Sequence, residues 1–342
     1  MSEAPPFWFK PPGLAAFLLS PFGKLYGSVA ARRMNLPARS HIDVPVLCIG
    51  NFIAGGAGKT PTAIALAKLA RDMGLRPGFL SRGYGGSVSK PTVVDLNSHN
   101  AHDVGDEALI LVQYAVSVVS PDRPAGARLL IDEGVDFIIM DDGFQNPSLH
   151  KDYTLAVIDA GRGLGNGYCI PAGPVRATLE VQLAHASAIL LIGQSEAGTA
   201  IVRQAAKAAK PVLNARMVSR NGVGWTGRKV LAFAAIGDPT KFFASLAKAG
   251  AELVERRSFH DHHPFTQEEC RDLMAKADRE GLTLVTTEKD AKRLMRMGAA
   301  QQALLSRSHV LFVDLVFDNA KMAQLVISDT LKRAEANRLA RH

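Results

Sequence analysis

Residues 50–61 of this 342-residue chain read Gly50-Asn-Phe-Ile-Ala-Gly-Gly-Ala-Gly-Lys-Thr-Pro61, and they are its most informative segment. The apolar run 44–49 before it predicts a buried strand, and residues 60–73 after it predict a helix. A glycine-rich turn between a strand and a helix, ending in Gly-Lys-Thr, is typical of a phosphate-binding loop. Backbone amides and the helix N-terminus then hold phosphate oxygens. The stretch therefore predicts a nucleoside triphosphate site.

We expect the nucleotide to contact eight residues of this loop: Ala54, Gly55, Gly56, Ala57, Gly58, Lys59, Thr60 and Pro61. Lys59 would reach the β- and γ-phosphates, and the Thr60 hydroxyl would bind Mg²⁺. The match is incomplete, because Ile53 stands where the general pattern has glycine. A chance Gly-Lys-Thr in a surface turn is the alternative, but the flanking strand and helix favour the phosphate loop.

Apolar runs alternate with helix-like stretches after the loop. We expect strands at 76–80, 116–120, 135–141, 154–159 and 187–193, and helices at 59–73, 105–115, 123–133 and 196–209. This alternation predicts an α/β fold of the P-loop NTPase type, with a doubly wound, mostly parallel sheet over residues 36–210. Ligands should bind at the carboxyl ends of its strands.

A second, smaller α/β domain is predicted over 230–342. Residues 211–229 carry Asn221-Gly222 between two apolar runs, which predicts a β-hairpin linker. Beyond it we expect strands at 230–235, 252–257, 282–286 and 309–316, and helices at 239–249, 267–280, 288–296 and about 319–338.

The N-terminal segment 1–35 has an unusual composition. Residues 7–33 interleave aromatic and apolar side chains with lysine and arginine, and no uninterrupted apolar run approaches the length of a membrane span. A cleaved signal peptide is not expected, because no basic region opens the chain. The pattern suits a segment that lies on an anionic membrane surface. A helix packed on the protein's own core is an equal alternative.

The charge and the cysteines restrict the partners. The net charge is +8, which favours an anionic partner such as nucleic acid, a phosphorylated substrate or a lipid surface, although solubility alone is an alternative. Cys48, Cys169 and Cys270 are widely spaced, which argues against a disulfide framework or a zinc site.

Two acidic clusters are candidates for metal binding and catalysis. The apolar strand at 135–140 runs into Asp141 and Asp142, and neighbouring strand residues point to opposite faces, so we expect only one of the two to face Mg²⁺ directly. A cap or turn role for both aspartates is the alternative. Asp106 and Glu107 open a predicted helix, where acidic residues often act only as caps. Near a nucleotide they become candidates for binding metal or for orienting an attacking hydroxyl.

Three histidines in 259–264 invite a metal site, but no cysteine or glutamate stands at a suitable spacing. We expect instead that one histidine pairs with a carboxylate across a cleft, with purely structural histidines as the alternative. Arg82 and Arg176 lie in glycine- or proline-rich loops, where a guanidinium could hold a phosphate in a bidentate manner. The run 286–290 has a capping pattern that could be only structural.

Several motifs together resemble the tetraacyldisaccharide 4'-kinase family of Gram-negative bacteria. Besides the phosphate loop they are Ser81-Arg-Gly-Tyr-Gly85, Val104-Gly-Asp-Glu107, Asp141-Asp-Gly-Phe-Gln145, Gly163-Leu-Gly-Asn-Gly167, Pro171-Ala-Gly-Pro174, Asp261-His-His263 and Thr286-Thr-Glu-Lys-Asp290. They run in family order over about 40–295. The chain departs from the family at Asn146, where histidine is usual, and at Ala108, where proline is usual.

The resemblance implies transfer of the γ-phosphate of ATP, with Mg²⁺, to the 4'-hydroxyl of a tetraacyldisaccharide 1-phosphate. It implies that 36–210 is the kinase domain, that the protein is peripheral on the cytoplasmic face of the inner membrane, and that it needs neither nucleic acid nor an obligate protein partner. The implied catalytic residues are Asp106 as base, His262 as its partner, Lys59, Asp141 and Asp142. Metal ligands would be Thr60, Glu107 and Asp141, and substrate contacts Arg82, Gln145, Asn146 and Arg176.

Two rival functions use a similar loop. A nucleotide switch, an ATPase or GTPase that changes partner affinity, would hydrolyse nucleotide slowly and phosphorylate no sugar. A nucleic-acid-dependent ATPase could use the positive charge. The aromatic residues, however, cluster at the N-terminus, away from any evident nucleic-acid groove.

Overall fold

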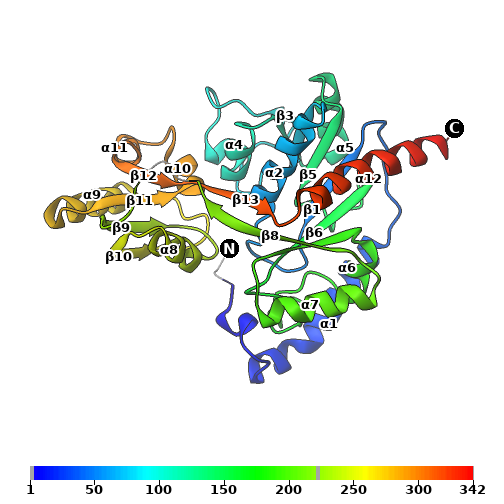
Figure 1. Ribbon diagram of the computed structural model, residues 1–342, viewed down its shortest axis with the longest axis horizontal. Helices are drawn as coiled ribbons and strands as arrows, with labels where there is room; N and C mark the ends of the chain where they lie inside the picture. Colours follow the sequence, from blue (N-terminus) through cyan, green and yellow to red (C-terminus); the bar gives the residue numbers. More distant parts are fainter. Residues whose placement is uncertain (1–3, 221–223, 342) are drawn as a thin grey trace.

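The computed structural model describes residues 4–220 and 224–341, which form two sheets flanked by helices (Figure 1). The larger unit contains β1 (Val46–Gly50), β2 (Pro77–Ser81), β3 (Thr92–Val93), β4 (Val116–Val119), β5 (Phe137–Asp141), β6 (Tyr153–Asp159), β7 (Ala188–Ile192), β8 (Val212–Ser219) and β13 (Val313–Phe317). Its helices are α1 (Leu14–Met34), α2 (Lys59–Asp72), α3 (Ala101–Val104), α4 (Asp106–Leu111), α5 (Arg123–Asp132), α6 (Leu179–His185), α7 (Glu196–Lys207) and α12 (Ala320–Leu339).

The larger sheet has the order β13-β8-β7-β6-β1-β5-β2-β4-β3, and only the edge strands β13 and β3 run antiparallel to their neighbours. Its central strands are buried along their whole length, because helices cover both faces. The predicted doubly wound, mostly parallel sheet is therefore confirmed. Since β1 lies between β5 and β6, the segments that follow these three strands meet at one edge of the sheet.

Alternating side chains of the central strands build two separate cores. Leu47 and Ile49 pack with α2 and α12 on one face, whereas Val46 and Cys48 pack with α5, α6 and α7 on the other. In Figure 1, α2 and α12 lie on one side of the sheet, and α1 lies beside α7 on the opposite side. This three-layer arrangement fixes the start of α2 beside the carboxyl end of β1.

The smaller unit is a four-stranded parallel sheet with the order β10-β9-β11-β12. Its strands are β9 (Lys229–Ala234), β10 (Glu252–Ser258), β11 (Thr283–Thr287) and β12 (Ser308–Leu311). Helix α8 (Pro239–Lys248) covers one face, and α9 (Gln267–Glu280) and α11 (Ala299–Arg307) cover the other. Helix α10 (Glu288–Leu294) packs against α4 of the larger unit. The sequence pattern did not predict α11.

The predicted C-terminal boundary of the smaller unit is wrong. The single strand expected at 309–316 is two strands, since β12 completes the smaller sheet and β13 pairs with β8 at the edge of the larger one. Helix α12 then buries Ala323, Val326 and Ile327 against the larger unit. The chain thus crosses between the units twice, and its last helix belongs to the larger one.

The predicted hairpin turn, Asn221-Gly222, lies outside the described residues. Strand β8, which precedes it, pairs in parallel with β7 and antiparallel with β13, and is an integral strand of the larger sheet. Two residues of this strand, Leu213 and Ala215, are buried and extend the core of the larger sheet.

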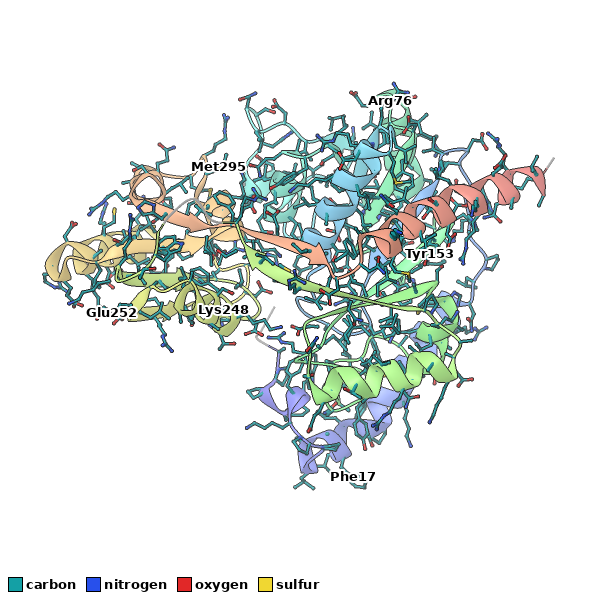
Figure 2. All side chains as sticks on the ribbon, viewed as in Figure 1. Phe17, Arg76, Tyr153, Lys248, Glu252 and Met295 are labelled. Carbon is teal, nitrogen blue, oxygen red and sulfur yellow. The ribbon has the colours of Figure 1, made fainter. Side chains whose placement is uncertain are left out.

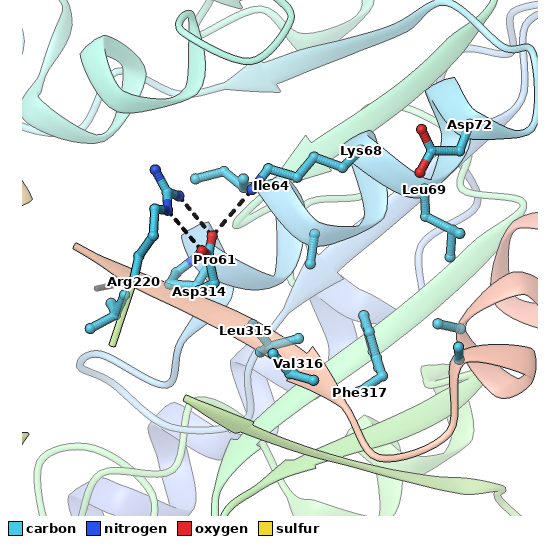
Figure 3. Close-up of a pocket in the computed structure, with 14 residues that line it drawn as sticks. Pro61, Ile64, Lys68, Leu69, Asp72, Arg220, Asp314, Leu315, Val316 and Phe317 are labelled. Atoms are coloured by element: carbon cyan, nitrogen blue, oxygen red, sulfur yellow. Dashed lines mark hydrogen bonds and ion pairs between the residues drawn. The ribbon is translucent and has the colours of Figure 1, made fainter. Parts of the chain in front are cut away.

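A cavity of about 300 Å³ lies between α2 and β13, close to both crossings (Figure 3). Apolar side chains of Ile64, Leu69 and Phe317 line it, and an ion-pair cluster closes one end. In that cluster the Asp314 carboxylate accepts hydrogen bonds from Arg220, at 2.7 Å, and from Lys68, at 3.2 Å. The cluster ties the first crossing strand, the returning strand and the helix of the phosphate loop together.

The N-terminal segment forms a short 3₁₀ helix, η1 (Pro6–Phe9), followed by α1. The Trp8 indole donates to the carbonyl of Pro171, and the close approach of α1 to the loop at Cys169 leaves no room for a side chain at Gly23 or Gly27. By length and composition α1 could cross a membrane, a possibility that the interrupted apolar pattern of the sequence did not indicate. Its opposite face, described below, is exposed.

Candidate active site

The phosphate loop, residues 51–58, joins the carboxyl end of β1 to the N-terminus of α2, as predicted. The Asn51 side chain donates to the carbonyls of Ile53, at 2.7 Å, and Gly55, at 3.0 Å, and so fixes the path of the loop. Gly55 and Gly58 have φ values of 105° and 88°, a region that residues with a Cβ rarely adopt. The missing glycine at Ile53 is thus compensated within the loop.

Asp142 is paired with cations of the site. Its carboxylate accepts a hydrogen bond from Arg176 at 2.9 Å, and Lys59 lies 3.7 Å away. Burial alone would raise the pKa of this carboxyl, but the charges of Lys59 and Arg176 outweigh it and lower the pKa to about 2. The backbone of Asp142 has φ 52°, a strained value for a residue other than glycine.

Asp141, the last residue of β5, is in the opposite situation. Its side chain is buried, and its Oδ1 atom has no hydrogen-bond partner among the described residues. Burial, and then the negative charge of Glu107, raise the pKa of Asp141 to about 7. A buried carboxylate without a partner is costly. Of the two neighbouring aspartates, Asp141 is therefore the one that forms no ion pair within the described residues, although the charge of Lys59 lowers its pKa in part.

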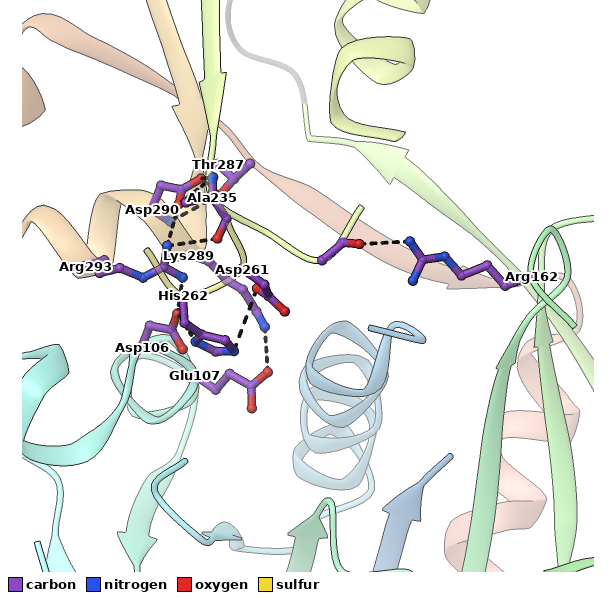
Figure 4. A network of polar contacts seen from close by, with 11 residues as sticks. Asp106, Glu107, Arg162, Ala235, Asp261, His262, Thr287, Lys289, Asp290 and Arg293 are labelled. Atoms are coloured by element: carbon purple, nitrogen blue, oxygen red, sulfur yellow. Dashed lines mark hydrogen bonds and ion pairs between the residues drawn. The ribbon is translucent and has the colours of Figure 1, made fainter. Parts of the chain in front are cut away.

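Asp106 begins α4 and is buried against the smaller unit. The Nδ1 atom of His262 lies 3.3 Å from its Oδ2 atom, and Arg293 also pairs with Oδ2, whereas Oδ1 has no partner among the described residues (Figure 4). Burial would raise the pKa of Asp106, but the hydrogen bond to His262 and the charges of Lys289 and Arg293 hold it well below its usual range. Asp106 is therefore ionised.

The cations around Asp106 come from α10. Lys289 pairs with Glu107, and Arg293 is held in place by Asp290, at 2.8 Å, and by the carbonyl of Ala235, at 3.0 Å. Sequence motifs alone give these two cations no role, because their partners lie more than 180 positions away in the chain. The only signal is the 286–290 motif, whose pattern predicts a cap, and Thr287 does cap α10.

Of the three histidines in 259–264, one contacts a carboxylate of the larger unit, as expected, and the other two do not. His262 has a left-handed backbone, with φ 60°, and its ring packs edge-on against Tyr84, with ring centroids 5.3 Å apart. His263 instead pairs with Glu269 within the smaller unit. His260 is exposed.

The four predicted substrate contacts are not equally placed. Arg176 and Gln145 lie together at the Asp142 loop, and the Gln145 amide donates to the carbonyl of Asn51 at 3.0 Å. The Asn146 side chain accepts a hydrogen bond from the backbone of Ser148, so it is turned into its own loop. Arg82 is exposed, without a polar partner in the described part of the chain. Their contacts with substrate remain predictions.

Comparisons with known proteins agree along the whole chain. Residues 15–331 match the family described as tetraacyldisaccharide-1-P 4'-kinase. A tetraacyldisaccharide 4'-kinase of Agrobacterium fabrum is 50% identical over 99% of this chain and 97% of its own. One of Rhizobium rhizogenes is 49% identical over 99% of this chain and 96% of its own.

Among solved structures, the crystal structure of LpxK from Aquifex aeolicus in complex with ATP is similar to this chain. Its TM-score is 0.68 at 23% sequence identity, and the match covers 93% of this chain and 99% of that chain. At this identity the likeness shows the shared fold. With the family match and the near-complete coverage of close relatives, it follows that this chain belongs to the tetraacyldisaccharide-1-phosphate 4'-kinase family.

Proposed function

We propose that this kinase transfers the γ-phosphoryl group of ATP to the 4'-hydroxyl of a tetraacyldisaccharide 1-phosphate, and that Asp106 accepts the proton of that hydroxyl. The observation that carries the assignment is the Asp106 carboxylate, which is buried and ionised and has one oxygen without a protein partner among the described residues. That oxygen is the acceptor available to a substrate hydroxyl. A nucleotide switch has no need of such a group.

His262 acts as a positioning residue for Asp106. The hydrogen bond with Asp106 raises the pKa of the imidazole, which favours the protonated form, and the contact fixes Oδ2 so that Oδ1 faces away. Because Asp106 and His262 come from different units, the base is complete only when the two units are together. This arrangement would limit transfer of phosphate to water in the absence of substrate.

Charge neutralisation carries most of the catalysis, because the transition state of phosphoryl transfer is loose. Lys59 and the amides of the phosphate loop bind the β- and γ-phosphates. The Asp142 carboxylate pairs with both Lys59 and Arg176 and so holds the two cations close to each other.

Mg²⁺ fits the residues present. Mg²⁺ prefers hard oxygen donors. Three residues offer them: Asp141 through its unpartnered Oδ1 atom, Glu107 through its nearby carboxylate, and the buried Thr60 at the start of α2. In the described chain no three Asp, Glu, His or Cys residues gather into a ligand set, so phosphate oxygens would complete the coordination. When bound, Mg²⁺ would neutralise charge on the phosphates. The Lys289 ammonium pairs with Glu107 and offsets part of the negative charge of the Asp141 and Glu107 carboxylates.

We propose further that α1 binds the protein to the cytoplasmic face of the inner membrane. Seven large apolar side chains on α1 are exposed: Leu14, Phe17, Leu18, Phe22, Leu25, Tyr26 and Val29. Phe17 is 69% exposed, and Figure 2 shows it projecting away from the rest of the protein. Lys24, Arg32 and Arg33 accompany this face and suit anionic lipid.

An interfacial position suits α1 better than a membrane span. Gly23 and Gly27 pack against the loop at Cys169, and Ala16 and Met34 near the two ends of α1 are also buried, so one side of the helix faces the protein. The substrate supplies the reason for docking: each buried CH₂ is worth about 0.8 kcal/mol, so acyl chains do not leave the bilayer readily. The enzyme must therefore reach the headgroup at the membrane surface.

The decisive experiment follows label from γ-labelled ATP to a tetraacyl disaccharide 1-phosphate in mixed micelles with Mg²⁺. We expect a labelled 4'-phosphate with wild type, and a loss of at least about 10²-fold with Asp106→Ala. ATP hydrolysis that is independent of lipid, with no labelled lipid, would reject the kinase reaction in favour of a nucleotide switch.

A further inference from the structure

Arg162 is a cation of the site that none of the sequence motifs contains. It follows β6, whose carboxyl end lies beside that of β1. Its Nη1 atom lies 3.4 Å from the position that a Cβ on Gly55 would occupy, so the guanidinium borders the phosphate loop. The side chain is only 18% exposed.

The guanidinium is held by two other parts of the chain. Its Nη2 atom donates to the carbonyl of Gly237, at 2.8 Å (Figure 4). The same atom pairs with the Asp238 carboxylate, at 3.2 Å. The ring of Phe9 in η1 lies 4.9 Å from the guanidinium carbon, a cation–π contact. Nε and Nη1 have no protein acceptor among the described residues, and Nη1 is the donor that borders the phosphate loop.

The segment of the smaller unit that holds Arg162 also faces the loop. A Cβ on Gly237 would lie 3.8 Å from the backbone nitrogen of Gly56. The two units therefore bring the Arg162 guanidinium and the amides of the phosphate loop to the same place. Lys59 is the usual cation of such a loop, but Asp142 neutralises part of its charge. A second cation would therefore help to neutralise the negative charge of the phosphoryl group during transfer.

We propose that Arg162 is a catalytic residue whose guanidinium binds the γ-phosphoryl group during transfer; this rests on the phosphoryl-transfer function proposed above. As the bond from phosphorus to the β-phosphate oxygen breaks and the bond to the sugar oxygen forms, negative charge spreads over the three remaining γ oxygens. Arg162 donates hydrogen bonds to those oxygens and neither gains nor loses a proton, while the hydroxyl proton goes to Asp106. An arginine supplied within the same chain is a known solution to this charge problem.

Planarity makes arginine suited to this position. The rigid guanidinium fixes the direction of the free Nη1 donors while Nη2 is held by the smaller unit, whereas an ammonium binds as a point charge. The carbonyl of Gly237 holds the other side of the guanidinium, so the position of the smaller unit sets its orientation. The competing explanation is that Arg162 only ties the two units together.

The test compares Arg162→Gln and Arg162→Lys with Asp238→Asn, which breaks the ion pair between the units but keeps the guanidinium. Full-length variants that match wild type in thermal denaturation are assayed for transfer to lipid in micelles with Mg²⁺. The same micelles are used to measure the affinities for ADP alone and for ADP with aluminium fluoride, a mimic of the phosphoryl group in transfer.

We expect Arg162→Gln to lower kcat by about 10³-fold or more, as for other arginines of this kind. Its affinity for ADP should stay within about twofold of wild type, while its affinity for ADP with aluminium fluoride falls steeply. Arg162→Lys should be intermediate, because it keeps the charge and loses the fixed direction of the planar donors. Asp238→Asn should stay within about fivefold of wild type in kcat, because an ion pair that solvent reaches is of small energetic value.

Equal losses in Arg162→Gln and Asp238→Asn, or an equal fall in affinity for both nucleotide states, would overturn the proposal in favour of a structural tie. Failure of the lipid reaction gives a different result. Wild type would then form no labelled lipid, yet its affinity for ADP with aluminium fluoride would still depend on Arg162, and the contact with the phosphoryl group would stand.

Discussion

The Nδ1 atom of His262 lies 3.3 Å from the Oδ2 atom of Asp106, so a histidine of the smaller unit pairs with a carboxylate of the larger one. The hydrogen bond raises the pKa of the histidine, and together with Lys289 and Arg293 it outweighs the effect of burial on the aspartate and lowers its pKa. Both groups are thus held in their charged forms. Such pairing aims a base without requiring that the histidine itself touch the substrate.

His262→Ala should therefore lower kcat by about 10²-fold, because Asp106 loses the contact that orients it. KM for ATP should change little, since the phosphate loop is untouched. Steady-state phosphate transfer to the lipid measures both. The matched control is His260→Ala, two residues away and exposed, which should keep wild-type turnover. Unchanged turnover in His262→Ala would exclude the pair from the mechanism.

Asp141→Asn and Asp142→Asn should change stability in opposite directions. At pH 8 without Mg²⁺, Asp141→Asn should raise the free energy of unfolding by about 1–2 kcal/mol, because it removes a buried charge that has no partner among the described residues. Asp142→Asn should lower it by a similar amount, because Lys59 and Arg176 lose their carboxylate. Urea denaturation of the two variants measures this, and both should lose phosphate transfer.

The pH dependence of the stability difference between Asp141→Asn and wild type supplies the control for this prediction. The pKa of Asp141 is raised from about 4 to about 7 in the folded protein, so folding is favoured by its proton at low pH and this gain is lost as the pH rises through 7. The advantage of Asp141→Asn should hence grow between pH 4 and pH 7 and then level off. A constant difference across this range would show that the Asp141 carboxyl is not the titrating group.

Local sequence patterns predicted the parts of this structure that depend on neighbouring residues. The phosphate loop, the strand ending at Asp141 and the start of α4 at Asp106 each follow from a short run of side chains with its own periodicity or turn chemistry. The pairing of Asp106 with His262 and the choice of Glu107 as a metal ligand came from the resemblance to a family. Residue spacing alone left caps and structural histidines open.

The remaining features depend on contacts between distant segments. Nothing near Arg293 indicates that it meets Asp106, because its helix reaches that residue only through the packing of α10 on α4. Residues 309–316 are predicted as one strand because most of them are apolar. The same pattern is found whether the segment joins one sheet or divides between two, as it does here. The apolar face of α12 likewise does not say which unit it covers.

Phe17→Ser with Phe22→Ser should weaken binding to anionic vesicles by at least about 10-fold, because burial of each phenylalanine is worth about 1.5–3 kcal/mol. Co-sedimentation with vesicles of mixed neutral and anionic lipid measures the affinity. Leu339→Ser is the matched control, since Leu339 on α12 is as exposed as Phe17, at 69%, and lies outside α1. An equal loss with Leu339→Ser, or none with the double variant, would argue against α1 as the docking surface.

Asp314→Asn should destabilise the protein by about 1 kcal/mol near pH 7, because Asp314 joins Arg220 and Lys68 where the chain crosses between the units. The hydrogen bond from Arg220 is the largest influence on this carboxyl and lowers its pKa to about 2. A lowered pKa gives stability that is present above about pH 4 and lost as the pH falls through 2. Thermal denaturation from pH 7 to pH 2 should therefore show wild type and variant converging toward acid. Curves that stay parallel would mean that the introduced amide disturbs packing around the cavity rather than removing an ion pair.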